Sequence, residues 1–427
     1  MPARPTVANI TVTQVAVPDP PLLNAAGCHE PYALRSIVEI EDTAGHVGLG
    51  EAYGDDGTAN ALRDAGSRLR GLDPWNLTAV WAAAAGVAPG TGAGATLNAP
   101  GADRSRAGNA YAALEVACLD LQGQQAGVPI AELLGGRHRG EVEFSAYLFY
   151  KCGRHAPRDS GEQPPADDWG EALDPAGIVR QARRFVDRYG FSTFKFKGGV
   201  FPPEQEVEAA AALRAAFPNA LLRLDPNALW SVETSVGAGG RLNEIGLEYY
   251  EDPTRGMEGM AAVRRRTGLP TATNMCVTSF ADLPKAVQFQ PVDFILSDHH
   301  FWGGVRATVR LSAFCRDFGI GVSMHSNTHL GVSMAAMVHV GAAMPHLTAA
   351  CDTHFPWQME HDLVNERFEF RGGRLKVPET PGLGVTLNRD RLATMHQDWE
   401  RCGIRRRNDA DEMRRHQPGW EYKNPRW

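Results

Sequence analysis

The chain of 427 residues contains 43 lysine and arginine residues against 50 aspartate and glutamate residues, a formal net charge of −7 at pH 7. This balance, without a long basic block, argues against nucleic acid or an anionic membrane as the main partner. The seven cysteines are scattered without CxxC spacing, and no apolar run reaches the length of a membrane span. We therefore expect a cytoplasmic protein with reduced thiols.

The first part of the chain predicts an α+β unit. Residues 9–18 and 36–53 alternate apolar and polar side chains as strands do, and DTAGH at 42–46 supplies a hairpin turn. Residues 108–127 then place apolar side chains along one face of a helix. We predict that this N-terminal domain covers residues 1–137.

From residue 138 onward, short β-rich runs alternate with helical stretches. Eight strands are predicted, at 141–150, 191–199, 221–228, 247–253, 270–274, 292–298, 319–326 and 349–355. This alternation predicts a parallel sheet, and eight units predict a closed barrel. The expected fold is α/β, with a TIM-like (β/α)7β or eight-fold barrel over 138–385 and a C-terminal segment, 386–427, that returns to the N-terminal domain.

A polar residue stands near the end of seven successive predicted strands. These residues are Lys197, Asp225, Glu251, Asn274, Asp298, His325 and Asp352, separated by 23 to 28 residues. That interval is close to the length of one βα unit. Because the carboxyl ends of barrel strands meet at one mouth, we expect these side chains to lie together.

Three of these residues, on neighbouring strands, offer oxygen donors. Asp225, Glu251 and Asn274 provide two carboxylates and an amide, the ligands that hard divalent cations prefer. No cluster with zinc spacing competes with them in the sequence. The pattern therefore predicts a Mg²⁺ site at the barrel mouth.

Two kinds of base flank this expected metal site. Lys195 and Lys197 share one face of a strand, and His325 lies across the barrel with Asp298 one strand earlier to orient it. Bases on both sides of a metal suit removal of a proton next to a carboxylate, with the metal stabilising the negative charge of the enediolate. We expect the charge of one lysine to disfavour the ammonium form of the other, which would make a lysine usable as a base.

Six sequence stretches carry a specific resemblance. They are KFK at 195–197, LDPNALW at 224–230, YYEDP at 249–253, TATNMCVT at 271–278, SMHSNTHLG at 323–331 and CDTHFPWQ at 351–358. Together they resemble the enolase superfamily, and within it the glucarate dehydratase group, which is similar to mandelate racemase and muconate lactonizing enzyme. The resemblance spans nearly the whole chain and implies that the N-terminal domain caps the barrel.

The resemblance also implies roles for individual residues. It implies that Lys197 and His325 are opposite bases, with Lys195 completing the lysine pair and Asp298 orienting the histidine. The implied Mg²⁺ ligands are Asp225, Glu251 and Asn274. The implied substrate contacts are His29, Arg106, Tyr147, Asn227, Asn327, His354 and Arg426.

Other residues near these motifs are given different roles. Arg106 departs from the small hydroxyl residue that the group leads us to expect, and an arginine there suits a substrate with two carboxylates. His299, His300 and His329 are placed behind the site. The RRR runs at 264–266 and 405–407 are interpreted as solvated faces.

The resemblance implies a Mg²⁺-dependent hydro-lyase acting on an acid sugar, with D-glucarate as first choice and 5-dehydro-4-deoxy-D-glucarate as product. Three alternatives stay open: a dehydratase of another acid sugar such as galactarate, an epimerase using the same two bases, and a non-catalytic barrel that binds sugar acids. The expected partners are a small acid-sugar substrate and further copies of the chain in a homo-oligomer. Formation of a keto acid separates dehydration from epimerisation.

Overall fold

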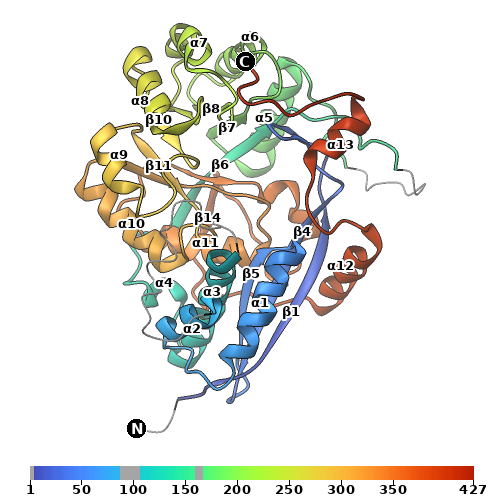
Figure 1. Ribbon diagram of the computed structural model, residues 1–427, viewed down its shortest axis with the longest axis vertical. Helices are drawn as coiled ribbons and strands as arrows, with labels where there is room; N and C mark the ends of the chain where they lie inside the picture. Colours follow the sequence, from blue (N-terminus) through green and yellow to red (C-terminus); the bar gives the residue numbers. More distant parts are fainter. Residues whose placement is uncertain (1–3, 87–105, 159–166) are drawn as a thin grey trace.

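The structure is a computed structural model that describes residues 4–86, 106–158 and 167–427. Its N-terminal part is a three-stranded antiparallel sheet in the order β1–β4–β5, packed against helices (Figure 1). The elements are β1 (Val7–Pro18), β4 (Tyr32–Asp42), β5 (Val47–Tyr53), α1 (Asp56–Leu69), α2 (Leu77–Ala85) and α3 (Arg106–Ala126). The predicted N-terminal α+β unit is confirmed.

Helix α3 lies against this sheet because glycines in β5 let the two backbones approach. A Cβ atom on Gly50 would overlap the carbonyl oxygen of Ala113, and one on Gly48 would overlap that of Ala117. Only glycine leaves room at such positions. The pattern of glycines in β5 therefore sets how closely the helix packs on the sheet.

A second sheet of parallel strands runs in the order β12–β11–β10–β9–β8–β7–β6–β13. The strands are β6 (Glu141–Phe149), β7 (Thr193–Lys197), β8 (Leu221–Asp225), β9 (Tyr249–Glu251), β10 (Thr271–Thr273), β11 (Phe294–Ser297), β12 (Gly321–Met324) and β13 (Cys351–Thr353). The sheet curls round until its two edge strands, β12 and β13, meet. The N–H of Thr348, just before β13, donates to the carbonyl of Val322 in β12 at 3.0 Å. All eight predicted strands are present.

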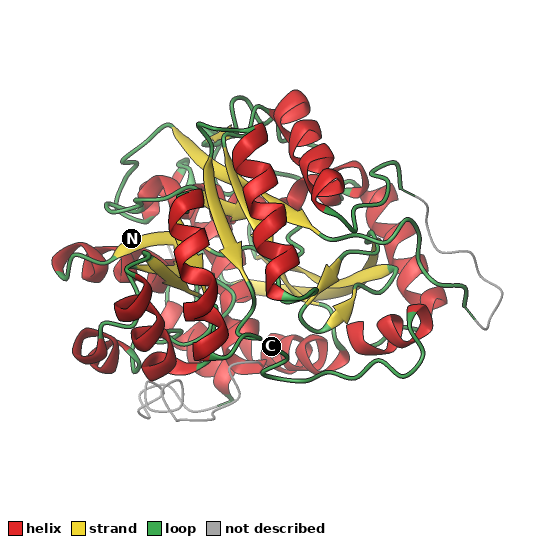
Figure 2. Ribbon diagram, turned by 90° about the horizontal axis from the view of Figure 1, so that it is seen from above, coloured by secondary structure: helices red, strands yellow, loops and turns green. Residues whose placement is uncertain are grey.

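A helix follows each strand from β6 to β12 and covers the outside of the sheet (Figure 2). The helices are α5 (Pro175–Tyr189), α6 (Pro203–Ala216), α7 (Val232–Ile245), α8 (Gly256–Thr267), α9 (Leu283–Phe289), α10 (Val305–Asp317) and α11 (Gly331–Ala343). Local signals delimit α5, for example: Asp174 accepts from the N–H of Gly177 at its start, and Gly190 ends it in a left-handed conformation. The predicted TIM-like (β/α)7β barrel is confirmed.

Helix α11 joins the two parts of the molecule. Every residue from Gly331 to Ala343 is buried, in keeping with its almost wholly apolar sequence. The helix packs against β6 of the barrel and also against β5 and α4 (Ile130–Leu133) of the N-terminal part. A helix that is apolar all round needs such neighbours on every side.

The C-terminal segment touches both parts. Strand β14 (Arg374–Lys376) pairs with β6, α12 (Arg389–Cys402) packs along β1, and α13 (Asp409–His416) packs on a hairpin of β2 (Leu23–Asn24) and β3 (Gly27–Cys28). The chain then crosses to the barrel (Figure 1), where the carbonyl of Trp427 accepts from the N–H of Ser231 at 2.6 Å. The domain boundaries after residues 137 and 385 stay predictions.

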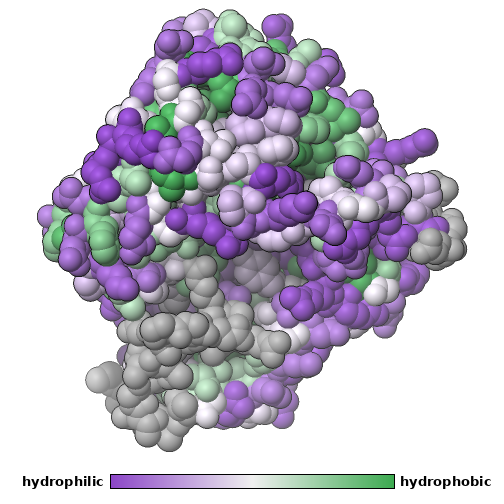
Figure 3. Space-filling view, turned by 45° about the horizontal axis from the view of Figure 1, so that its top comes forward, coloured by the Kyte–Doolittle hydropathy of each residue, from purple (hydrophilic) through white to green (hydrophobic). Residues whose placement is uncertain are grey.

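The surface drawn in Figure 3 is mainly hydrophilic, with hydrophobic residues in separate groups. In the parts of the chain that the structure describes, every helix is too short or too polar to cross a lipid bilayer. The expected cytoplasmic location and homo-oligomeric assembly stay predictions.

Candidate active site

The seven polar residues predicted near the ends of successive strands do meet at one mouth of the barrel. Lys197, Asp225 and Glu251 are the last residues of β7, β8 and β9, and Asn274 directly follows β10. The remaining three are Asp298 directly after β11, His325 directly after β12, and Asp352 within β13. Their predicted placement at one mouth is confirmed. Parallel strands of a barrel bring their carboxyl ends to the same edge, which explains it.

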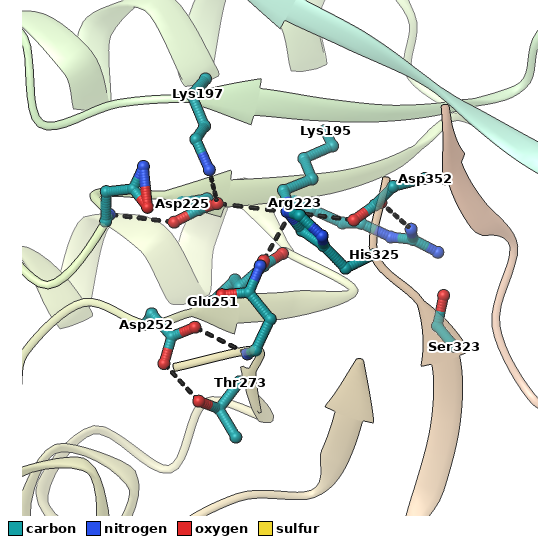
Figure 4. A network of polar contacts seen from close by, with 12 residues as sticks. Lys195, Lys197, Arg223, Asp225, Glu251, Asp252, Thr273, Ser323, His325 and Asp352 are labelled. Carbon is teal, nitrogen blue, oxygen red and sulfur yellow. Dashed lines mark hydrogen bonds and ion pairs between the residues drawn. The ribbon is translucent and has the colours of Figure 1, made fainter. Parts of the chain in front are cut away.

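Lys195 lies at the centre of a buried cluster of carboxylates (Figure 4). Its Nζ donates to Glu251 Oε1 at 2.5 Å and to Asp352 Oδ2 at 2.9 Å, and lies 3.3 Å from Asp225 Oδ2. The Nζ of Lys197 donates to Asp225 Oδ2 at 2.6 Å. The two lysines thus share a carboxylate rather than standing alone on the inward face.

This pairing decides the charge of Lys195. Burial by itself lowers the pKa of Lys195, but the carboxylates of Asp352 and Glu251 raise it well above its ordinary value. Lys195 therefore stays an ammonium ion. The base expected from the lysine pair is Lys197, and that role stays a prediction. The structural work of Lys195 is to hold the carboxylates, with the ring of Tyr147 lying 4.8 Å from its Nζ.

The oxygen donors fit a Mg²⁺ ion. Glu251 Oε2 is buried and has no hydrogen-bond partner, so one oxygen is available to a cation. Burial and the negative charge of Asp225 raise the pKa of Glu251 well above its ordinary value, and a bound cation would relieve both effects. Asp225, Glu251 and Asn274 offer only oxygen as side-chain acceptor atoms, which is the donor set that Mg²⁺ takes.

Asp252 positions one of these donors and was missed by the sequence reasoning. Its Oδ1 accepts from Thr273 Oγ1 at 2.5 Å and its Oδ2 from the N–H of Asn274 at 2.8 Å. The backbone of Asp252 has a φ angle of 36°, a conformation that residues other than glycine rarely adopt. The adjacent Asp in YYEDP was the available signal, because it follows a predicted ligand directly.

His325 is held in its neutral form. Its Nδ1 lies 3.1 Å from Oδ2 of the fully buried Asp298. Burial lowers the pKa of His325 below its ordinary 6.5, although the Asp298 carboxylate opposes this shift. The pKa of Asp298 lies well below its ordinary value despite burial, mainly because of His300, whose Nδ1 is 2.8 Å from Oδ1. The ionised carboxylate keeps the proton on Nδ1 of His325 and leaves Nε2 with a free lone pair.

Two imidazoles, of His29 and His354, line the same mouth of the barrel. His29 and His354 stack with their ring centroids 5.8 Å apart and their planes at 13°. Asp19 Oδ2 lies 3.0 Å from His29 Nδ1, and Gln358 Oε1 lies 2.8 Å from His354 Nδ1. His354 Nε2 is buried without a hydrogen-bond partner, and burial lowers the pKa of His354 to about 4. A neutral ring with an unused nitrogen is suited to a substrate hydroxyl.

These side chains surround a cavity of about 450 Å³, within the size range of small-ligand sites. The predicted residues that line it are His29, Tyr147, Lys197, Asn227, Asn274, His325, Asn327 and His354. Lys195, Asp225, Glu251 and Asp298 lie buried around it, at most 1% exposed. The fold thus brings together the predicted bases, oxygen donors and most of the expected substrate contacts.

The predicted arginines are placed differently. Arg426 is not among the described lining residues; its guanidinium lies near the carbonyls of Gly199 and Ala25, at 3.3 and 3.4 Å. Arg106 begins α3, but its side chain lies outside the described residues. Their proposed substrate contacts stay predictions.

Arg407 lines the cavity instead, which corrects the interpretation of 405–407 as a solvated face. Its Nε and Nη2 donate to both oxygens of Asp409 at 2.6 and 2.7 Å, and Asp409 also lines the cavity. The run RRR gave no sign of which arginine turns inward. The acidic NDAD that follows was the only signal of a partner.

Two family models match the chain. The "Enolase C-terminal domain-like" model matches residues 177–391, and the "Mandelate racemase / muconate lactonizing enzyme, N-terminal domain" model matches residues 7–135. The chain belongs to the enolase superfamily. The resemblance predicted from the six sequence stretches is confirmed.

Close relatives of this superfamily member match along its whole length. A protein of Streptomyces coelicolor named "Probable glucarate dehydratase" is 48% identical, with 99% of each chain covered. A solved enolase from Thermobispora bispora complexed with magnesium and formate is 49% identical, with a TM-score of 0.92 over 99% of this chain and 100% of that chain. One from Pseudomonas fluorescens with bound magnesium, potassium and tartrate is 48% identical, with a TM-score of 0.92 and full coverage of both chains.

These findings confirm that this enolase-superfamily chain is an enzyme, of the hydro-lyase class. They support an acid-sugar dehydratase as the coarse description of its activity.

Proposed function

We propose that the protein is a Mg²⁺-dependent dehydratase that converts D-glucarate into 5-dehydro-4-deoxy-D-glucarate. One observation carries the proposal: Lys197 and the neutral His325 face the same cavity from β7 and β12, beside the oxygen donors of β8 to β10. The likeness to a "Probable glucarate dehydratase" and to an enolase that binds magnesium and tartrate supports it.

Each group has a proposed task. Asp225, Glu251 and Asn274 would hold Mg²⁺, which when bound supplies positive charge that makes the proton next to the substrate carboxylate more acidic. His325 Nε2 or Lys197 Nζ removes that proton, depending on the configuration of the carbon. His325 Nε2 carries the proton that it has removed or, where Lys197 was the base, one that it takes from solvent. It donates this proton to the β-hydroxyl, which leaves as water, and the resulting enol becomes the keto acid.

The direct test incubates the enzyme and Mg²⁺ with a panel of aldarates and aldonates and measures keto-acid formation. We expect keto acid from D-glucarate at the highest kcat/KM. Bases on both sides of one carbon also suit an epimerase, and inverted substrate without keto acid would establish that activity instead. Absence of turnover on every acid sugar would contradict the proposal.

Asp298→Asn should prevent His325 from acting as a base while leaving the shape of the cavity unchanged. The Asn amide can donate to Nδ1 of His325, which moves the ring proton to Nε2 and removes the lone pair. We expect kcat/KM to fall by about 10²–10⁴-fold, the range for one positioned proton-transfer group, with KM changing little. Steady-state kinetics check this. His300→Gln is the matched control, because it removes the other partner of Asp298 and should cost far less.

The pH profile should reflect the lowered pKa of His325. The free base is present above that pKa and is lost as the pH falls through it, so kcat/KM should stay high at neutral pH. The acid limb should lie below the ordinary histidine value of 6.5. A limb above pH 6.5 in the wild type would contradict the assignment of His325 as a neutral buried base.

Two arginines allow a test of carboxylate binding. Arg407→Ala should raise KM for D-glucarate by about ten- to 100-fold, the range for a lost hydrogen bond to a charged group. KM for an aldonate, which lacks the second carboxylate, should change much less. Arg426→Ala, the matched control, should leave both KM values within a few-fold. The opposite result would return the contact to Arg426, as the resemblance implies.

A further inference from the structure

Two thiols and an imidazole meet beside the active-site cavity, outside the machinery described above. One ligand atom from each of Cys28, Cys152 and His416 lies within 4.8 Å of the other two. Thiolate and imidazole are the ligands that zinc and other borderline metals select. We propose that these residues form a second metal site, separate from the Mg²⁺ site, with Zn²⁺ as its ion.

The three residues come from three segments that other contacts already hold in place. Cys28 ends β3, Cys152 follows β6, and His416 ends α13. A Cβ atom on Gly27 would overlap the carbonyl of Asp409, which shows how closely the hairpin and α13 pack. The N–H of Cys152 also donates to the carbonyl of Pro21 at 3.0 Å, just before the hairpin.

The surroundings favour a ligand over simple packing. Cys28 is fully buried, and the side chain of His416 is 19% exposed. His416 Nε2 is buried without a hydrogen-bond partner, and Glu412 Oε1 lies 3.9 Å from it, which leaves room for an ion between the two atoms. Within the described residues, none of the other cysteines belongs to a comparable cluster of ligand atoms. Those cysteines therefore have the environment of ordinary buried or half-buried thiols.

Distance and charge both fit zinc. In a tetrahedral site with Zn–S bonds of about 2.3 Å and Zn–N bonds of about 2.0 Å, ligand atoms lie about 3.3–3.8 Å apart. The three atoms lie within 4.8 Å of one another and would move closer by up to about 1 Å to reach that geometry. Zn²⁺ binding would release the protons of both thiols to solvent, because a metal-bound cysteine is the thiolate. Two thiolates, a neutral imidazole and water as fourth ligand would balance the charge of Zn²⁺.

Such an ion would fix the wall of the catalytic cavity. His29, which directly follows Cys28, lines the cavity together with Arg407 and Asp409. Asp409 is the first residue of α13, the helix that ends at His416. A metal that joins β3, the end of β6 and α13 would limit the relative movement of those segments. The inferred role is therefore structural support of the substrate-binding wall rather than chemistry.

The test uses the full-length protein with Mg²⁺ present and adds Zn²⁺ or Co²⁺ alone. We expect about one tightly bound Zn²⁺ per chain, measured by competition with a chromophoric chelator. Co²⁺ should give a thiolate-to-metal charge-transfer band and tetrahedral ligand-field absorption. Amide hydrogen exchange in residues 21–29 and 409–416 should slow when Zn²⁺ binds.

Cys28→Ser and Cys152→Ser should each weaken Zn²⁺ binding by more than about tenfold and abolish the charge-transfer band. Cys402→Ser is the matched control, since this half-buried thiol lies on α12, and it should change neither. Glu251→Gln should keep the band, which separates this site from the oxygen donors. Equal Zn²⁺ affinity in wild type and both serine variants, absence of the band, or a Cys28–Cys152 disulfide that persists with Zn²⁺ would overturn the proposal.

Discussion

His325→Gln should abolish dehydration of both epimers while one of them still exchanges its α-proton with solvent. Gln keeps the size of the side chain but cannot accept the proton or deliver it to the departing hydroxyl. Loss of one positioned proton-transfer group costs about 10²–10⁴-fold, and here two steps depend on it. Lys197 and the oxygen donors are untouched, so the proton on the lysine side should still leave.

Lys197→Ala supplies the complementary result. Dehydration of the epimer on the histidine side should be reduced but detectable, and exchange of the opposite epimer should cease. Each variant is incubated with each epimer and Mg²⁺ in D₂O, and the α-proton signal is followed by NMR. If His325→Gln stops exchange on both faces while substrate still binds, Lys197 is an electrostatic residue and not a base.

Glu251→Gln should remove turnover while leaving the folded protein intact. Burial and the charge of Asp225 raise the pKa of Glu251 well above its ordinary value, because both disfavour its negative charge in the metal-free protein. A Gln side chain removes that charge at nearly the same size, and we expect the metal-free thermal midpoint to change little. The amide lacks the charge that attracts Mg²⁺, so the rise in thermal midpoint on adding Mg²⁺ should disappear.

Thermal unfolding with EDTA or Mg²⁺, beside a keto-acid assay, measures both effects. Glu248→Gln is the matched control, because Glu248 pairs with Arg223 at 2.6 Å at the opposite end of the same strand region. It should lower stability without removing the Mg²⁺ response. Wild-type activity that depends on Zn²⁺ and ignores Mg²⁺, or an unfolded Glu251→Gln protein, would contradict the assignment of Glu251 as a Mg²⁺ ligand.

The barrel and the ring of polar residues at its mouth could be predicted from local sequence patterns. Apolar runs at regular intervals fix strands, and a parallel barrel brings all their carboxyl ends together. The placement of Lys197, Asp225 and Glu251 therefore needed no knowledge of distant contacts. The same holds for His325 beside Asp298, whose strands are neighbours in the sheet.

Which groups stay charged, and which distant segments meet, depends on contacts between residues far apart in the chain. Lys195 keeps its ammonium form because Asp352, 157 residues away, lies 2.9 Å from it, and the spacing of two lysines cannot reveal that carboxylate. Arg407 lines the cavity because α13 packs on the β2–β3 hairpin. Cys28 and Cys152 converge for the same reason: contacts between segments depend on packing, which no local pattern encodes.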